Sequence, residues 1–404
     1  MNRVCSIFSQ ILQLISRAAF AEAVHKHKAE RHARGFSSWG QFVAMLFCQL
    51  GGAKSLREVV GGLAASEGKL RHLGLPQAPT RSTLAYANQH RPWQLYQEVF
   101  QQVLGQCQSV AATHPSGKHK FRFKNKLLSV DATVIDLCAE TFDWARFRRT
   151  KGAVKLHLLL DHNGHLPCYA VITEGKKHEL PVARQWSYEP GTILVFDRAY
   201  IDYDWFADLT QRQVHFVTRM KENTDYEVVE ERVLPQRKGL LRDQVIFLYK
   251  QVKTSPECFL RRIEYYDEEH QRTLVFLTNH LTLSAATVAE IYKQRWQIEL
   301  FFKALKQNLR IKTFVGTSAN ALKIQIWAAL IALLLIKYLQ LKARFGWSLS
   351  NLVALLRQQL FVYRDLWSWL DQPFQSPPSG EPPAEPQLAL SLAGSLALDL
   401  GQQT

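Results

Sequence analysis

The chain has 404 residues, 47% of them hydrophobic, so it can bury a large core and is too long for one ordinary domain. Its 50 Lys and Arg residues against 35 Asp and Glu residues give a net charge of +15, which favours a polyanionic partner, first of all nucleic acid. A basic protein without such a partner is the alternative, because net charge governs association and not fold. The six cysteines lie far apart and have no metal-ligand spacing, which argues against a Cys/His zinc site and indicates a reduced chain.

The sequence predicts neither export nor membrane insertion. Arg3, Gln10, Gln13 and Arg17 interrupt the apolar residues at the N-terminus, where no secretory signal is evident. The apolar run at residues 324–336 is shorter than the ~20 residues that a membrane span requires, which predicts a buried core helix. We therefore expect a cytoplasmic protein with no membrane partner.

Residues 1–120 carry periodic apolar patches that predict a separate helical N-terminal domain. Thr80 is expected to open a helix that exposes Arg81, Asn88 and Arg91. These residues are candidate DNA contacts in a reader resembling a helix-turn-helix. A plain helical bundle is an equal alternative, because the two helices are too far apart in sequence for the short turn of that motif.

After the basic stretch at residues 118–126, the periodicity changes from helical to strand-like. The Asn163-Gly164 pair predicts a hairpin between two of the new strands. Three strands, a helix, a strand, a helix and a strand follow in the order of a ribonuclease-H-like domain. The expected elements lie at residues 127–131, 153–160, 166–172, 178–186, 192–197, 204–213 and 214–219.

The second half of the chain predicts an insertion and a helical end. Alternating apolar residues within 221–279 indicate an inserted β region, with strands at 245–252, 259–266 and 273–277. Ser284 is expected to cap a long helix that carries Glu299. The catalytic domain is thus assigned to residues 121–340, and residues 341–404 to a short helical region with a flexible tail. The fold class is α/β.

Three carboxylates occupy places where a metal site can form. Asp131 and Asp197 each close an apolar strand, and Glu299 lies on the later helix. Phosphoryl transfer commonly uses two metal ions about 3.5–4 Å apart, and carboxylates supply the hard oxygen ligands that Mg²⁺ accepts. Mn²⁺ would suit the same ligands. Taken singly, an Asp at a strand end is more often a turn former.

The helix around Glu299 has one polar face and one apolar face. At ~100° per residue, Tyr292, Arg295, Glu299 and Lys306 fall within an arc of about 60°. An ordinary ion pair between Arg295 and Glu299 on a solvated face is the alternative. The neighbouring arc, expected to be buried, holds Ile291, Ile298, Phe301, Phe302, Leu305 and Leu309.

The pattern Tyr292-x-x-Arg295-x-x-x-Glu299, followed by Lys306, resembles the Y-R-E-K signature of the DDE transposases of the bacterial insertion-sequence-four family. Residues 129–133 and 195–200 resemble the stretches around that family's first and second catalytic Asp. The resemblance covers roughly residues 57–361.

The resemblance implies a role for each matched residue. Asp131, Asp197 and Glu299 would hold two Mg²⁺ ions, Tyr292 and Arg295 would contact the transposon end, and Lys306 would neutralise a phosphate. Arg198, beside the second Asp, is a further candidate DNA contact. In the family, water nicks each element end to leave a 3′-hydroxyl that then attacks target DNA. The enzyme works as a homodimer in a synaptic complex and cuts in trans.

The sequence departs from some members of this family at one point, and two other functions are alternatives to transposition. Some relatives carry a Trp in the inserted region that stabilises a flipped base during hairpin formation, and residues 221–279 contain none, so a hairpin intermediate is not implied. Tyr226, Phe247 and Tyr249 are conceivable substitutes. The rival functions are a catalytically inactive transposon-derived DNA-binding protein and a ribonuclease-H-like nuclease that does not join strands.

Overall fold

The computed structural model describes residues 5–375, except residues 32, 34, 67, 114–120, 122, 139–141, 143, 145, 149–150, 236–237, 249–258 and 310–313. The tail at residues 376–404, including the predicted Pro-rich linker, lies outside the described residues.

The first part of the chain is helical, as predicted. Ser or Thr side chains cap five of these helices by accepting a backbone N–H of the first turn, which supplies one of the acceptors that a helix start lacks. Thr80 caps the helix that the sequence predicted after it. The helices are α1 Ile7–Gln13, α2 Arg17–Lys26, α3 Ser38–Leu50, α4 Leu56–Ala64, α5 Arg81–His90 and α6 Gln94–Thr113, with a 3₁₀ turn at Leu70–Leu73.

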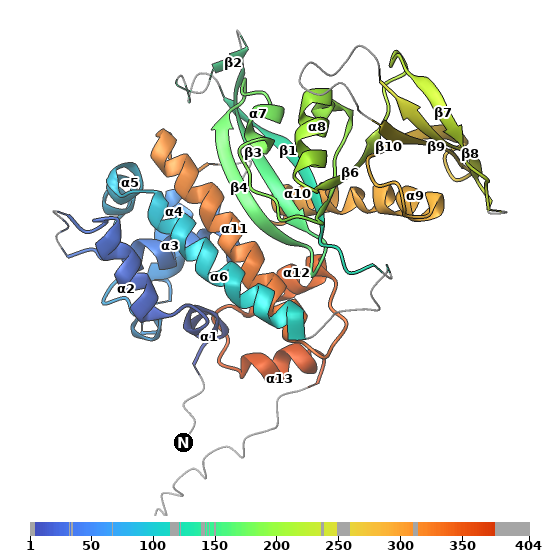
Figure 1. Cartoon of the computed structure of the whole chain (residues 1–404). Coiled ribbons are helices and arrows are strands. Elements are labelled where there is room, and N and C mark those ends of the chain that lie inside the picture. The colour runs from blue at the N-terminus through green and yellow to red at the C-terminus, as the bar shows by residue number, and fades with distance from the viewer. Residues whose placement is uncertain are drawn as a thin grey trace, which may run out of the picture.

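A long apolar helix, α11 (Ala319–Lys342), lies beside α6 and α3 (Figure 1). Residues 324–336 are buried along its whole circumference, which confirms the predicted core helix. Its length of 24 residues exceeds our expectation, because half-buried residues continue the helix at both ends of the apolar run. Within the described residues it is the one helix long and apolar enough to cross a membrane by composition alone, and 83% of its apolar window is buried by the rest of the chain.

The N-terminal helices do not form a core of their own. One hydrophobic core joins α1–α6 to α10–α13 and to one face of the sheet, with α12 at Leu349–Gln359 and α13 at Leu366–Asp371. Ser6 forms a β-bridge with Tyr363, and the Gln10 side-chain amide donates to the Arg364 carbonyl at 2.7 Å. The packing therefore does not divide the chain at residues 120 and 340, where we expected domain boundaries.

The sheet is mixed. β1 (Leu127–Cys138) pairs antiparallel with β3 (Lys151–Asp161), which pairs antiparallel with β4 (Leu166–Glu174) across the predicted Asn163-Gly164 turn. On its other side β1 pairs parallel with β5 (Ile193–Val195), and β5 pairs parallel with β6 (His215–Arg219). A short strand, β2 (Arg146–Arg148), also pairs with β3.

Helices cover both faces of this sheet. α7 (Leu180–Ala183) and α8 (Tyr203–Gln211) pack on one face, over Leu194 and Phe196 of the β5 segment. α9 (Ala285–Gln294) and α10 (Trp296–Asn308) pack on the opposite face, α9 over Ile193 and Val195 and α10 over the far half of β1. Side chains alternate along a strand, so each strand contributes to both cores.

The inserted β region extends the same sheet. β10 (Arg272–Thr278) pairs antiparallel with β6, and β9 (Phe259–Asp267), β8 (Leu240–Phe247) and β7 (Glu227–Glu231) follow in that order. β8 begins five residues before the predicted strand at 245–252, part of which lies outside the described residues. β7 was not predicted, since all five of its residues are exposed and show no alternation.

A substitution at Leu330 can test whether α11 and the N-terminal helices share one core. It is fully buried in α11, so Leu330→Ala should lower the unfolding free energy by about 2–5 kcal/mol. Because α11 contacts α3, α5 and α6, the N-terminal helices should unfold in the same shifted transition. Urea unfolding followed by circular dichroism measures this, with exposed Lys342→Ala as the control. An unshifted transition of the N-terminal helices would contradict a shared core.

Candidate active site

Asp131 and Asp197 occupy equivalent positions on neighbouring parallel strands. Ser129 of β1 is in register with Val195, the last residue of β5. Asp131 lies two residues further along β1, and Asp197 lies two residues past the end of β5, where the backbone is still extended. A step of two returns a side chain to the same face. Asp131 is also paired with Leu158, which faces the core beneath α10. Both carboxylates therefore point to the face that α9 and α10 cover.

The predicted single helix around Glu299 is two helices that meet at Arg295. α9 ends at Gln294 and α10 begins at Trp296, while Arg295 keeps αR dihedral angles. The Arg295 N–H donates to the Tyr292 carbonyl at 3.0 Å, a tighter i→i−3 bond. The break has a packing cause, since Ile291 belongs to the core under the β5 and β6 strands and Ile298 to the core shared with the helices. The predicted burial of the apolar face is confirmed.

Arg295 links two of the three predicted carboxylates. Its guanidinium Nη2 lies 2.6 Å from Glu299 Oε1, and its Nη1 lies 3.9 Å from Asp131 Oδ2. Only 16% of the Arg295 side chain is exposed. The Arg295–Glu299 pair is therefore part of a three-residue cluster at the sheet and not a pair on a solvated helix face.

Tyr292 completes this group from the end of α9. The Arg295 guanidinium carbon lies 5.6 Å from the centroid of its ring, a cation–π distance, and the ring packs 5.1 Å from that of Phe276 on β10. Burial raises the pKa of the Tyr292 hydroxyl, which keeps the phenol neutral. Tyr292, Arg295, Glu299 and Asp131 thus lie together.

The charge state of Asp131 depends on its surroundings. Its pKa is raised from 3.8 to about 7, first by burial and then by the negative charges of Asp197 and Glu179, against the opposing Ala132 N–H and Arg295. Asp197 is half-buried, and its Oδ1 accepts the Ala199 N–H at 2.8 Å. Two carboxylates that repel each other at a partly desolvated sheet face match the hard oxygen ligands of a divalent ion.

Lys306 and Arg198 flank the carboxylates in different ways. The Lys306 ammonium donates to the Val134 carbonyl at 2.8 Å, which ties α10 to β1. The Arg198 side chain is 43% exposed and lies 3.8 Å from the exposed Glu222 carboxylate. Arg198 follows Asp197 directly in the chain, and Lys306 lies on the same helix as Glu299. Their contacts with DNA stay predictions.

Two of the predicted N-terminal DNA contacts are not exposed as expected. Arg81 is exposed at the start of α5, but Asn88 is only 1% exposed and accepts the Gln41 side-chain N–H at 2.8 Å inside the helical core. Leu84, Ala87 and Asn88 share the inward face of α5. The prediction of Asn88 as an exposed DNA contact was wrong, because a buried partner satisfies its amide. Arg91 is half-buried and donates to the Ser37 carbonyl at 2.8 Å.

The sequence reasoning missed Glu179. Its carboxylate lies 3.1 Å from the Lys155 ammonium, and its charge contributes to the raised pKa of Asp131. Glu179 stands at the start of α7, opposite β3 in the fold, and no spacing in the sequence connects it to Asp131. Only the tertiary arrangement reveals this fourth carboxylate near the site.

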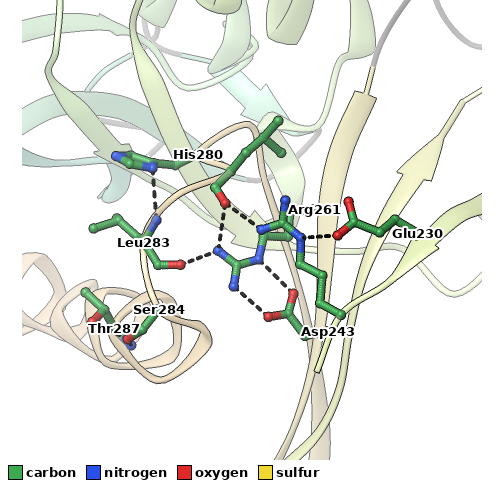
Figure 2. Close-up of polar contacts among 9 residues, drawn as sticks. Glu230, Asp243, Arg261, His280, Leu283, Ser284 and Thr287 are labelled. Carbon is green, nitrogen blue, oxygen red and sulfur yellow. Dashed lines mark hydrogen bonds and ion pairs between the residues drawn. The ribbon is translucent and has the colours of Figure 1, made fainter. Parts of the chain in front are cut away.

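The inserted strands fix the start of α9 through a buried ion pair. Arg261 of β9 makes two hydrogen bonds, of 2.7 and 2.6 Å, to the Asp243 carboxylate on β8, and both side chains are at most 5% exposed. Arg261 also donates to the Leu283 carbonyl, just before Ser284 caps α9 (Figure 2). The insertion therefore holds the helix that carries Tyr292 toward the carboxylates.

The chain matches a known family over the sheet that carries these residues. Residues 122–335, more than half of the 404 residues, match the family model described as the transposase DDE domain, and the chain therefore belongs to this family. With the insertion-sequence relatives below, it is a DNA transposase, an enzyme that cuts and joins DNA strands with divalent metal ions. Residues 4–76 match a domain of unknown function, DUF4372.

Three curated relatives carry transposase names. The chain is 29% identical over 295 residues, 72% of its length and 80% of the relative's, to a Sinorhizobium fredii protein named as the transposase y4zB. It is 29% identical over 281 residues, 67% and 70% of the two lengths, to a Geobacillus stearothermophilus protein named as a transposase for insertion sequence element IS5377. A Synechocystis protein named as a transposase for insertion sequence element IS4SA is 42% identical over 64 residues, 16% and 19% of the two lengths.

Among solved structures, the chain is similar to the piggyBac transposase in a synaptic complex with hairpin DNA. The TM-score is 0.41 at 11% identity, over 92% of this chain and 81% of that chain.

Asp131→Asn should stabilise the metal-free protein in a pH-dependent way. Because the folded pKa of about 7 lies above the ordinary 3.8, the stability linked to Asp131 is complete below pH 3.8 and is lost as the pH rises through about 7. A neutral amide avoids that loss. The gain in unfolding free energy should therefore be larger at pH 8 than at pH 4, by about 2–4 kcal/mol.

Denaturant unfolding in EDTA measures this gain, with the exposed Asp225→Asn as the matched control. A gain of equal size at both pH values would show that Asp131 does not titrate near neutrality.

Proposed function

We propose that Asp131, Asp197 and Glu299 form the metal-binding triad of a cut-and-paste transposase of the insertion-sequence-four type. The observation that carries this proposal is the register of β1 and β5, which sets the two aspartates side by side on the face where Arg295 holds Glu299. The strand order β4-β3-β1-β5-β6, with β1, β3 and β4 antiparallel and β1, β5 and β6 parallel, supports a ribonuclease-H-like catalytic core.

Two Mg²⁺ ions are the proposed cofactor. When bound, they supply activation of the attacking oxygen and stabilisation of the leaving one. Mn²⁺ suits the same ligands. The chain's own contribution is a set of carboxylate oxygens on rigid elements, since Asp131 and Asp197 extend strands and Lys306 fastens α10 to β1.

Arg295 has a second proposed role. In the absence of DNA it forms ion pairs with Glu299 and Asp131, and its guanidinium has further N–H donors that can pair with a backbone phosphate. Tyr292 lies against its guanidinium and restricts where that group can go. Tyr292, Arg295, Lys306 and Arg198 are the proposed contacts to the transposon end, and Arg81 is a proposed contact of the helical region.

The proposed partners are the ends of the element and its target DNA. The net charge of +15 supports a long polyanionic partner over a short one. A homodimer that cuts in trans is the assembly that the family resemblance suggests. We place the protein in the bacterial cytoplasm without a membrane partner, which the burial of α11 supports.

Glu299→Gln should abolish cleavage and spare DNA binding. The amide keeps the size of the side chain and removes the charge that serves the metal, so nicking should fall by at least ~10²-fold. Nicking and strand transfer of labelled DNA carrying the element's own ends, with Mg²⁺ or EDTA, measures this beside binding by mobility shift. Asp225→Asn is the control, and Mg²⁺-dependent nicking retained in Glu299→Gln would reject the triad.

Arg295→Ala should weaken binding to the transposon end and reduce its salt dependence. Loss of one phosphate contact lowers the slope of log K against log salt by about 0.9. Fluorescence anisotropy in EDTA over a series of KCl concentrations gives the slope, with Arg212→Ala, at the C-terminal cap of α8, as the control. An unchanged slope would show that Arg295 does not contact a DNA phosphate and only pairs with the carboxylates.

A further inference from the structure

A cavity of about 310 Å³ opens between α10, α11 and the start of α12, beyond the carboxylate cluster. Every charged side chain that lines it is basic, namely Lys303 of α10 and Lys337 of α11. His165, Gln297, Gln307 and Ser350 add polar groups that can donate hydrogen bonds. The lining contains no carboxylate, so the cavity is suited to an anion.

Lys337 is an unusual residue for its place in the fold. It follows directly on the fully buried Ile336 in the long apolar helix α11, and it has no ion-pair partner among the described residues. Burial lowers the pKa of its ammonium. A partly desolvated charge without a partner costs stability, and a hydrophobic residue of the same size would avoid that cost. An anionic ligand would supply the missing partner.

His165 lies on the β3–β4 turn at the same cavity. Its Nδ1 is buried and has no hydrogen-bond partner. Its pKa is lowered to about 4, first by burial and then by the charge of Lys337, so the ring is neutral at pH 7. A neutral imidazole beside Lys337 can donate one hydrogen bond to an oxyanion without adding a second buried charge.

The first turn of α12 also lines the cavity. Ser348 caps this 11-residue helix, and Leu349 and Ser350 are its first two residues. Their backbone N–H groups have no acceptor within the helix, and the helix dipole adds partial positive charge at this end. The first turn contains no acidic residue. The first turn of α12 therefore lines the same cavity as Lys303 and Lys337.

Lys303, which lines the cavity, lies about one helical turn beyond Glu299 on α10. Lys303 follows Glu299 by four residues, which is a rise of about 6 Å along a helix. Glu299 and Lys303 also differ by only ~40° around the helix axis, so both belong to adjoining strips of its surface. A strand whose scissile phosphate lies at the carboxylates would bring a nearby phosphate within reach of Lys303.

We propose that this cavity binds a backbone phosphate of the DNA strand that passes the carboxylate site. Lys303 meets the phosphate at the rim, and Lys337, His165 and the first turn of α12 hold it inside. The inference rests on the proposed function, since it takes DNA as the ligand and Glu299 as part of the active site. It adds a phosphate site outside the triad and outside the Tyr292, Arg295 and Lys306 set.

The substitution Lys337→Met distinguishes phosphate binding by Lys337 from a purely structural role of this residue. The substitution keeps an unbranched side chain of similar length and removes the unpaired charge, so thermal stability should be unchanged or higher. Binding should weaken about five- to tenfold, and the slope of log K against log salt should fall by about 0.9, as for one lost phosphate contact. Lys342→Met is the matched control, because this exposed residue of the same helix changes the net charge equally.

The assay is fluorescence anisotropy with a labelled duplex that lacks the element's ends, in EDTA and over a series of KCl concentrations. If Lys342→Met weakens binding as much as Lys337→Met, or if neither changes it, the phosphate site is rejected. The phosphate site is also rejected if the unaltered chain does not bind this duplex at low salt. Should Lys337→Met fail to fold, Lys303→Gln at the exposed rim must show the same loss of slope.

Binding in EDTA does not require the metal, so the result is independent of whether the triad is assigned correctly. Absence of Mg²⁺-dependent cleavage by the unaltered chain would refute the proposed function. A normal salt slope in Lys337→Met would refute only the phosphate site.

Discussion

The parallel register of β1 and β5 is the constraint on which the site depends. It forces two carboxylates to the same height on neighbouring strands, at a face that α9 and α10 partly desolvate. Burial first, and then the charge of Asp197, disfavour the ionised form of Asp131 and raise its pKa. Such a pair persists in a folded protein when a cation compensates it. Arg295 supplies part of that compensation. Divalent metal ions, on which transposases of this family depend, would supply the rest if they bind at the proposed triad.

The break between α9 and α10 follows from the same geometry. A continuous helix would have to pack Ile291 and Ile298 against one surface, whereas the sheet and the helical core present two. At the break, Arg295 keeps αR dihedral angles, and its guanidinium lies 3.9 Å from the Asp131 carboxylate. The buried Arg261–Asp243 pair then fixes where α9 begins, so the insertion acts on the site through the direction of one helix.

The local secondary structure around the site could be predicted from the sequence. Alternation and turn residues predicted β3, β4 and the hairpin between them, Ser284 and Thr80 marked helix starts, and the 3.6-residue period predicted which side of the Glu299 helix is buried. What it did not contain is tertiary: the helix break at Arg295, the buried amide of Asn88 and the approach of Glu179 each depend on a partner far away in the chain. The role of the triad itself came from a spacing pattern that resembles a family, because two aspartates at strand ends carry little information alone.

Buried charged groups of this chain are of two kinds: those paired within the protein, which stabilise the fold, and those without sufficient compensation, which a ligand could neutralise. Arg261 and Asp243 are almost fully buried, yet each satisfies the other through two hydrogen bonds, so nothing further is required of them. Asp131 and Lys337 are also desolvated, and their pKa values move in opposite directions, toward the neutral form in both cases. The carboxylate lacks a sufficient cation and the ammonium lacks an anion. The proposed metal ion at Asp131 and the proposed DNA phosphate at Lys337 would return both groups to their charged forms. On this view the free protein gives up stability at its proposed cofactor and substrate sites.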